Sequence, residues 1–168
     1  PTFRQPHAMS YHVAYAGQGG AGKTTAAIWT SREAWRQAGR RSIVSDPNET
    51  VWGPQALVYR GAKQMEAFWA KVWSSWNCNV YVDEVATMMP RDQDANEVFT
   101  RVRHQGHQLH VILHHAANLL PIQRDALGTL FLFNQNVGSL KIFADEWNDE
   151  RIMQAAKLPK FHFLLCRK

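Results

Sequence analysis

Short apolar runs alternate along this chain with longer segments in which apolar residues recur every three or four positions. Short runs are typical of buried strands, and the longer pattern is typical of helices with one apolar face. The pattern predicts strands at residues 11–15, 42–45, 55–60, 79–82, 109–113, 129–133 and 161–165. It predicts helices at residues 25–38, 62–76, 92–104, 121–127 and 147–158. This alternation favours an α/β fold of three layers, with helices on both faces of a mostly parallel sheet.

The predicted helix at 62–76 carries an unusual number of large aromatic residues. Trp69 and Trp76 lie on one helical stripe, and Trp73 widens it. Aromatic residues at helical spacing usually belong to the core, but this many on one helix also fits a contact between subunits. Both interpretations stay open at this point.

A glycine-rich stretch joins the first predicted strand to the first predicted helix. It has the pattern G-x-x-x-x-G-K-T, in which glycines allow several backbone N–H groups to converge on a phosphate. Lys23 can reach the β- and γ-phosphates, and the Thr24 hydroxyl can hold Mg²⁺. The sequence therefore predicts a P-loop NTPase that binds ATP and Mg²⁺. The expected nucleotide-binding residues are Gly17, Gln18, Gly19, Gly20, Ala21, Gly22, Lys23, Thr24 and Thr25.

Two carboxylates follow the buried strand at 79–82. Asp83 is placed to bind Mg²⁺, directly or through water, and Glu84 to act as the general base for an attacking water. An Asp-Glu pair about 60 residues after a phosphate loop favours hydrolysis of ATP over phosphate transfer to a small molecule.

Hydrolysis also needs a residue that senses the γ-phosphate and a cation that neutralises charge in the transition state. Polar residues that follow the strand at 109–113 suit the first role: His114, His115 and Asn118. An arginine from a neighbouring subunit commonly supplies the second. The candidates are Arg91, Arg101, Arg103 and Arg124. We favour Arg124, because it follows the sensor strand in a segment that a neighbour in a ring could present.

Five histidines lie within 12 residues: His104, His107, His110, His114 and His115. Gly106 interrupts the helix between the first two, and no cysteine lies nearby to complete a closed zinc site. We expect these histidines to be polar rim or nucleotide-sensing residues, with some contact to DNA, and no zinc to be bound.

Composition limits the remaining possibilities. At 168 residues the chain has the size of one domain, and we expect a single P-loop domain over residues 1–168. It contains no apolar run long enough for a membrane span, and its first residues lack the apolar segment of a signal peptide. Cys78 and Cys166 are expected to be buried free thiols. The net charge of +5 favours a polyanionic partner such as nucleic acid.

Taken together, these motifs resemble the HerA/FtsK group of DNA-pumping ATPases, and within it the genome-packaging ATPases of tailless, internal-membrane viruses. The resemblance covers roughly residues 10 to 136. It rests on the phosphate loop, Asp46-Pro47, Val82-Asp83-Glu84 and Arg103-His104-Gln105-Gly106, which precedes the strand His110-Val111-Ile112-Leu113.

The resemblance implies a ring, commonly a hexamer, with ATP between subunits and double-stranded DNA in the pore. It implies that Lys23 and Thr24 hold phosphate and Mg²⁺, Asp83 the metal and Glu84 the water. It also implies packaging of a viral genome into a preformed capsid, a partner at a capsid vertex or in a membrane, and a location in the host cytoplasm or on the virion. The family usually has Gln at the end of the sensor strand. Here we take His115 for that role.

Three alternatives remain. The same motifs resemble the Zot-like assembly ATPases of filamentous phages, which normally carry a membrane span. The stretch from Gly19 to Thr25 resembles the deviant loop of ParA/MinD partition ATPases. That family has Lys where this chain has Gln18 and lacks the Asp-Glu pair. A nucleotide-binding module without enzymatic activity is the last alternative, and the intact Lys23 and Glu84 argue against it.

Overall fold

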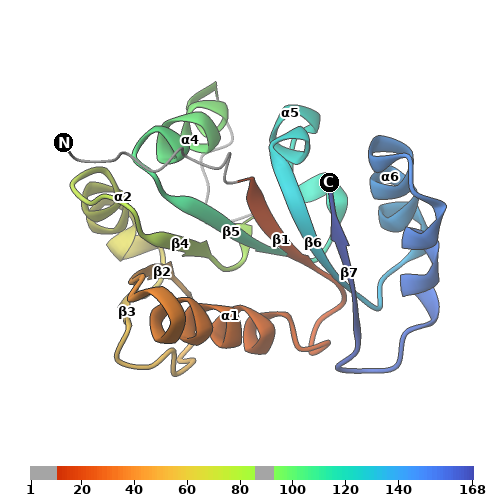
Figure 1. Cartoon of the computed structure of the whole chain (residues 1–168), viewed down its shortest axis with the longest axis horizontal. Helices are drawn as coiled ribbons and strands as arrows, with labels where there is room; N and C mark the ends of the chain where they lie inside the picture. Colours follow the sequence, from red (N-terminus) through yellow and green to blue (C-terminus); the bar gives the residue numbers. More distant parts are fainter. Residues whose placement is uncertain (1–10, 86–92) are drawn as a thin grey trace.

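Seven strands form one central sheet in the computed structural model, which describes residues 11–85 and 93–168 (Figure 1). Their order across the sheet is β3-β2-β4-β5-β1-β6-β7. Strands β1 to β6 pair with one another in parallel, and β7 pairs antiparallel with β6 at one edge of the sheet. The strands are β1 (His12–Ala16), β2 (Ser42–Ser45), β3 (Ala56–Tyr59), β4 (Asn79–Val82), β5 (Gln108–Leu113), β6 (Leu127–Phe133) and β7 (Phe163–Arg167).

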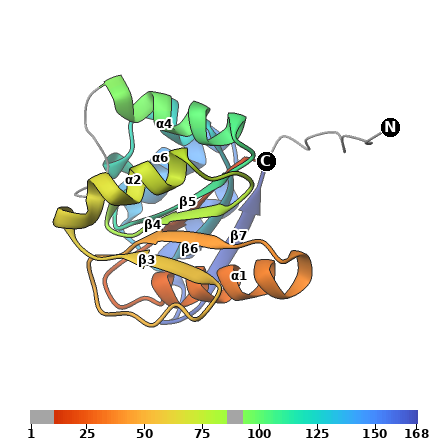
Figure 2. The same ribbon diagram turned by 90° about the vertical axis from the view of Figure 1, so that its left-hand side faces the viewer.

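Helices cover both faces of this sheet. The helix α1 lies on one face, and α2, α4 and α6 lie on the other (Figure 2). The predicted α/β fold of three layers is therefore confirmed. The α-helices are α1 (Lys23–Ala38), α2 (Met65–Trp73), α4 (Gln93–His104), α5 (Pro121–Asp125) and α6 (Val137–Trp147), and the 3₁₀ segments are η1 (Ala62–Gln64), η2 (Ala116–Asn118) and η3 (Glu150–Lys157).

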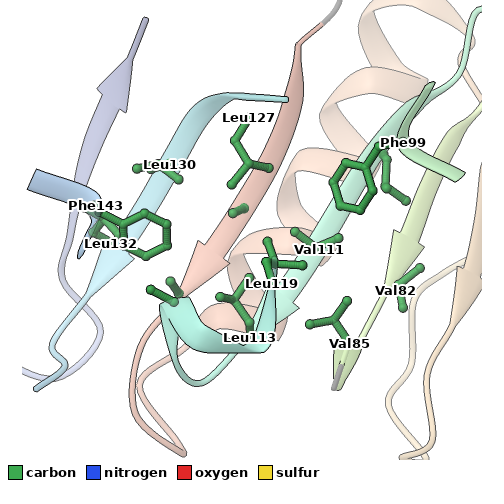
Figure 3. Close-up of a cluster of buried hydrophobic side chains, with 14 of the residues drawn as sticks. Val82, Val85, Phe99, Val111, Leu113, Leu119, Leu127, Leu130, Leu132 and Phe143 are labelled. Carbon is green, nitrogen blue, oxygen red and sulfur yellow. The ribbon is translucent and has the colours of Figure 1, made fainter. Parts of the chain in front are cut away.

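The larger core lies between the sheet and α2, α4 and α6. Alternate residues of neighbouring strands, such as Val82, Val111 and Leu130, point to this face and meet Phe99 of α4 and Phe143 of α6 (Figure 3). All five are at most 5% exposed. Burial of such side chains contributes roughly 1.5–3 kcal/mol each, so this core is a main source of the fold's stability.

A smaller core lies between the sheet and α1. Tyr15 and Ile112 point to this side, and Trp52 packs with them although it belongs to the loop between β2 and β3. Its indole Nε1 donates a hydrogen bond of 2.8 Å to Asp46, which follows β2. Asp46 also accepts a hydrogen bond from Arg60 at 3.0 Å. The Asp46-Pro47 motif thus organises the loop that completes this layer.

The aromatic residues of α2 have two different environments. Trp69 and Trp73 are partly buried against the larger core, as the core interpretation expects. The side chain of Arg101 from α4 stacks over Trp73, with 4.5 Å between the guanidinium carbon and the ring centroid. Trp76 lies beyond the end of α2 and is exposed. Of the three tryptophans, Trp76 is therefore the one that remains available for a contact between subunits.

The C-terminal part differs from the expectation. No element was expected at residues 137–146, but α6 occupies 137–147, and the predicted helix at 147–158 is mainly the 3₁₀ segment η3. The side chain of Asn136 accepts a hydrogen bond of 2.8 Å from the Ser139 N–H and so caps α6. Because no helix was expected to begin after residue 136, this capping signal was missed. The last strand begins two residues later than expected.

Candidate nucleotide-binding site

The phosphate loop is anchored on both sides of β1. The N–H of Gly17 donates to the Leu113 carbonyl at the end of β5 (3.2 Å), and the N–H of Gln18 donates to the Asn134 carbonyl after β6 (2.9 Å). Gly22, at the start of α1, has a φ of +105°, which a residue with a side chain rarely adopts. A Cβ on Gly17 would lie 2.6 Å from the Cβ of Phe133. Glycine is therefore required at both ends of the loop.

Lys23 lies within this loop. Its Nζ donates hydrogen bonds to the carbonyls of Gly17 (2.9 Å) and Gln18 (2.8 Å) and lies 3.5 Å from Nδ1 of His114. Burial lowers the pKa of Lys23, and the negative charge of Asp83 partly opposes this effect. Phosphate oxygens bound at the loop would add further negative charge near Nζ and would favour the ammonium form.

Thr24 and Asp83 are brought together although 59 residues separate them. The Thr24 hydroxyl donates to Oδ2 of Asp83 at 3.0 Å, and the Glu84 N–H donates to Oδ1 at 2.8 Å. Burial raises the pKa of Asp83, and the two hydrogen bonds lower it. A hydroxyl and a carboxylate at this separation are hard oxygen donors that suit Mg²⁺, which takes one or two protein ligands and completes its shell with phosphate and water. The predicted magnesium ligands fit that ion.

Glu84 follows Asp83 with a φ of +52°, an uncommon backbone conformation for a residue other than glycine. The side chain is partly buried, and its charge acts on His114 by raising the pKa of that imidazole. Residues with such backbone conformations cluster at active sites and ligand-binding sites. The carboxylate therefore belongs to the group of residues around the phosphate loop.

The two histidines after β5 occupy different places. His114 faces the phosphate loop, where burial and the charge of Lys23 lower the pKa of its imidazole. The ring of His115 instead meets the side chain of Asn136, with 3.1 Å between Nδ1 and Nδ2. Because β5 lies between β1 and β4, its end adjoins both the phosphate loop and the Asp-Glu pair. His114 therefore lies at the phosphate loop, whereas the predicted sensor His115 is turned toward Asn136.

Arg124 is held inside the subunit. Its guanidinium pairs with Glu146 of α6 (2.7 Å) and donates to the carbonyls of Ala116 and Leu119. These contacts would have to break before the side chain could reach a neighbouring subunit. The placement gives Arg124 a structural function, joining α5 to α6, and does not favour the predicted role in a neighbour's active site. Of the other candidates, Arg101 and Arg103 are exposed, and Arg91 lies outside the described residues.

We expect Arg124→Ala to lower the free energy of unfolding by about 2–4 kcal/mol, because it leaves two carbonyls and a carboxylate without their donor. Urea unfolding measures this loss. Arg151→Ala is the matched control, since it removes an exposed arginine paired with Asp149 and should change stability little. A different result would instead support the role in trans. In that case Arg124→Ala would be as stable as the wild type but would lose turnover, and subunits carrying Glu84→Gln would rescue turnover in mixed rings.

Two of the clustered histidines are interior residues and not the polar or sensing residues that the sequence suggested. His107 is buried and accepts a hydrogen bond of 3.0 Å from the Cys78 N–H, and His110 is buried beside the Tyr15 hydroxyl at 3.1 Å. Within residues 11–85 and 93–168, no group of three or more His, Cys, Asp or Glu side chains is placed to hold a metal ion. Cys166 is a buried free thiol as expected, and Cys78 is free but only partly buried.

These features define the class of the protein. A phosphate loop between a parallel strand and a helix faces a carboxylate pair two strands away, across the sheet edge where ligands of α/β proteins bind. This is the fold of a P-loop NTPase. No helix among the described residues is long and apolar enough to cross a membrane.

Comparison with known proteins agrees with this class. The sequence matches no protein-family model and no curated protein. The structure is similar to the genome-packaging NTPase B204 from Sulfolobus turreted icosahedral virus 2 in complex with ATPγS, with a TM-score of 0.76 and 17% identity over 95% of this chain and 93% of that chain. At this identity the similarity establishes a shared fold.

Two further solved structures are similar. VirB4 of Thermoanaerobacter pseudethanolicus has a TM-score of 0.70 and 10% identity over 98% of this chain and 88% of that chain. The N-terminal domain of zonular occludens toxin from Neisseria meningitidis has a TM-score of 0.54 and 17% identity over 74% and 76%. The expected resemblance to viral packaging ATPases is therefore confirmed at the level of the fold, and the Zot-like alternative shares that fold.

Proposed function

We propose that this chain is an ATP-hydrolysing motor that moves along double-stranded DNA and packages a viral genome into a preformed capsid. The observation that carries the proposal is the hydrogen bond from Thr24, next to Lys23 in the phosphate loop, to Asp83, which Glu84 follows at the carboxyl edge of the sheet. Structural similarity to a viral genome-packaging NTPase supports the choice of motor.

The chemistry follows from these residues. Backbone N–H groups of the loop and the positive end of α1 bind the phosphates, and Lys23 neutralises charge on the β- and γ-phosphates. Thr24 and Asp83 would hold Mg²⁺, which when bound supplies further positive charge to the phosphate oxygens. Glu84 accepts a proton from the water that attacks the γ-phosphorus. His114, beside Lys23, is placed to sense whether the γ-phosphate is present.

Movement along DNA requires more than one subunit and a grip that does not depend on base sequence. We propose a ring, with a hexamer as the expected form, in which arginines of one subunit complete the site of the next. The net charge of +5 is suited to contacts with backbone phosphates. We place the assembly in the host cytoplasm or on the virion, with a protein at a capsid vertex or in a membrane as its docking partner.

The test is the rate of ATP hydrolysis with and without long double-stranded DNA. We expect DNA to raise the rate several-fold, and its apparent affinity to fall about tenfold or more between about 50 and 200 mM salt, because phosphate contacts release counterions. Heparin is the control polyanion. It should compete with DNA without stimulating hydrolysis, since it offers charge but no duplex to track.

Hydrolysis that is rapid and indifferent to DNA would contradict the translocase. It would favour the Zot-like alternative, an assembly ATPase whose partner is a protein. The similarity to the zonular occludens toxin domain is the observation that keeps this alternative in view.

A further inference from the structure

The segment between η3 and β7 passes the end of the sheet that carries the phosphate loop (Figure 1). Phe161 of this segment contacts the loop at Gly22. Its Cδ1 lies 3.1 Å from the position that a Cβ on Gly22 would occupy. Gly22 is the residue immediately before Lys23 and the cap of α1. An aromatic ring therefore borders the part of the loop that receives phosphate.

Asn134 ties this segment to the phosphate loop. Its carbonyl accepts the Gln18 N–H at 2.9 Å, while its side-chain amide donates to the carbonyls of Ala156 (3.1 Å) and Leu158 (2.9 Å). One residue thus connects the loop with the chain on both sides of the end of η3. The position of Phe161 relative to the loop is set by hydrogen bonds as well as by contact.

Phe161 combines exposure with an unfavourable backbone conformation. Its side chain is 67% exposed, and its φ is +66°, a left-handed value that bulky residues rarely adopt. A hydrogen bond of 3.1 Å from the His162 N–H to the Pro159 carbonyl closes the turn, and Lys160 Nζ lies 5.0 Å from the ring centroid. Residues held in such conformations cluster at ligand sites. Neither the core nor the phosphate chemistry accounts for this ring.

The strand order sets the direction in which a triphosphate extends from the loop. Asp83 follows β4 and His114 follows β5, on one side of β1, whereas Phe161 precedes β7 on the other side. A triphosphate whose γ-phosphate faces Glu84 extends its α-phosphate and nucleoside away from β4. The nucleoside therefore extends toward β6 and β7, where Phe161 lies.

We propose that Phe161 stacks on the nucleobase of the bound ATP. The inference rests on the proposed function, because it takes the phosphate loop to bind a nucleoside triphosphate. Phe163, two residues later at the start of β7, adds a second aromatic ring to this part of the chain. It is 42% exposed and packs against Phe131 and Phe133, with centroid distances of 5.1 and 5.5 Å. A phenyl face accepts any purine, so this contact adds affinity without choosing between ATP and GTP.

The test compares the binding of ATP and of inorganic tripolyphosphate, both with Mg²⁺, by isothermal titration calorimetry. We expect Phe161→Ala to lower the affinity for ATP about five- to tenfold. This is the lower part of the range for base stacking, because the ring stays partly in water. The affinity for GTP should fall by a similar factor. Tripolyphosphate, which has no base, should bind both proteins equally.

Two variants complete the design. Phe161→Trp keeps an aromatic face and should retain ATP affinity. Leu165→Ala removes an apolar side chain that is also 42% exposed on the same sheet face, opposite Phe131, and should change nothing. The inference is overturned if Phe161→Ala binds ATP as tightly as the wild type. It is equally overturned if the variant's affinity for tripolyphosphate falls by the same factor, since the ring would then act by shaping the loop.

Failure of the proposed function gives a different result. A wild-type protein that binds ATP but shows no stimulation by DNA contradicts the translocase, while the ratio of ATP to tripolyphosphate affinity still reports on Phe161. A wild-type protein that binds neither ATP nor tripolyphosphate contradicts both.

Discussion

Replacing Glu84 by Gln is expected to lower the rate of ATP hydrolysis by about 10²- to 10⁴-fold while leaving ATP bound, because an amide cannot accept the proton of the attacking water. The substitution keeps size and shape, so the contact between the Glu84 N–H and Asp83 is retained. Binding should persist because Lys23, Thr24 and the loop N–H groups remain. Single-turnover hydrolysis and equilibrium binding of ATP separate the two effects.

Glu150→Gln is the matched control for this experiment. Glu150 is an exposed glutamate of η3, far in sequence from the phosphate loop, and its replacement should leave turnover unchanged. If Glu84→Gln hydrolyses ATP at the wild-type rate, Glu84 is not the general base and another group must activate the water.

Replacing Lys23 by Ala is expected to weaken ATP binding and to lower hydrolysis by about 10²- to 10³-fold, because the ammonium is the positive side chain at the phosphate position. The same substitution should alter the stability of the ligand-free fold much less. Burial already lowers the pKa of Lys23, which means that the charged form is disfavoured there without a phosphate. Its removal relieves that burial cost as well as breaking two hydrogen bonds to loop carbonyls.

Thermal unfolding with and without Mg·ATP measures both effects of Lys23→Ala. The wild type should gain stability on addition of Mg·ATP, because a ligand that binds the folded state alone raises the unfolding temperature, and the variant should gain little. Lys141→Ala, at an exposed position of α6, should behave as the wild type does. A full ATP-dependent shift in Lys23→Ala would show that the loop binds nucleotide without this lysine.

Much of the site was predictable because its parts are short and each carries its own chemistry. The phosphate loop is contiguous, Gly20 and Gly22 have the positive φ values that favour glycine, and Asp83 and Glu84 directly follow a buried strand. A parallel sheet brings the carboxyl ends of strands to one edge, so the pairing of Thr24 with Asp83 could be expected without knowing the strand order. The structure places these two side chains 3.0 Å apart.

Other assignments could not be made from local patterns. The two adjacent histidines after β5 are equivalent in sequence, and the direction of each side chain after the strand ends decides that His114 meets Lys23 while His115 meets Asn136. Arg124 was expected to be available to a neighbouring subunit, but Glu146, 22 residues later, holds it inside its own subunit. Each outcome depends on a partner from a different element, which no local pattern contains.

The sequence by itself determined the class of fold and the position of the phosphate loop, because hydrophobic periodicity and a contiguous motif encode them locally. The tertiary structure alone decided which histidine faces the loop, that Arg124 pairs with Glu146, and that Phe161 adjoins Gly22 across 139 residues of chain. The physical reason is that strand order and the packing of β7 at the sheet edge result from the cooperative burial of the whole core, and local periodicity does not specify them.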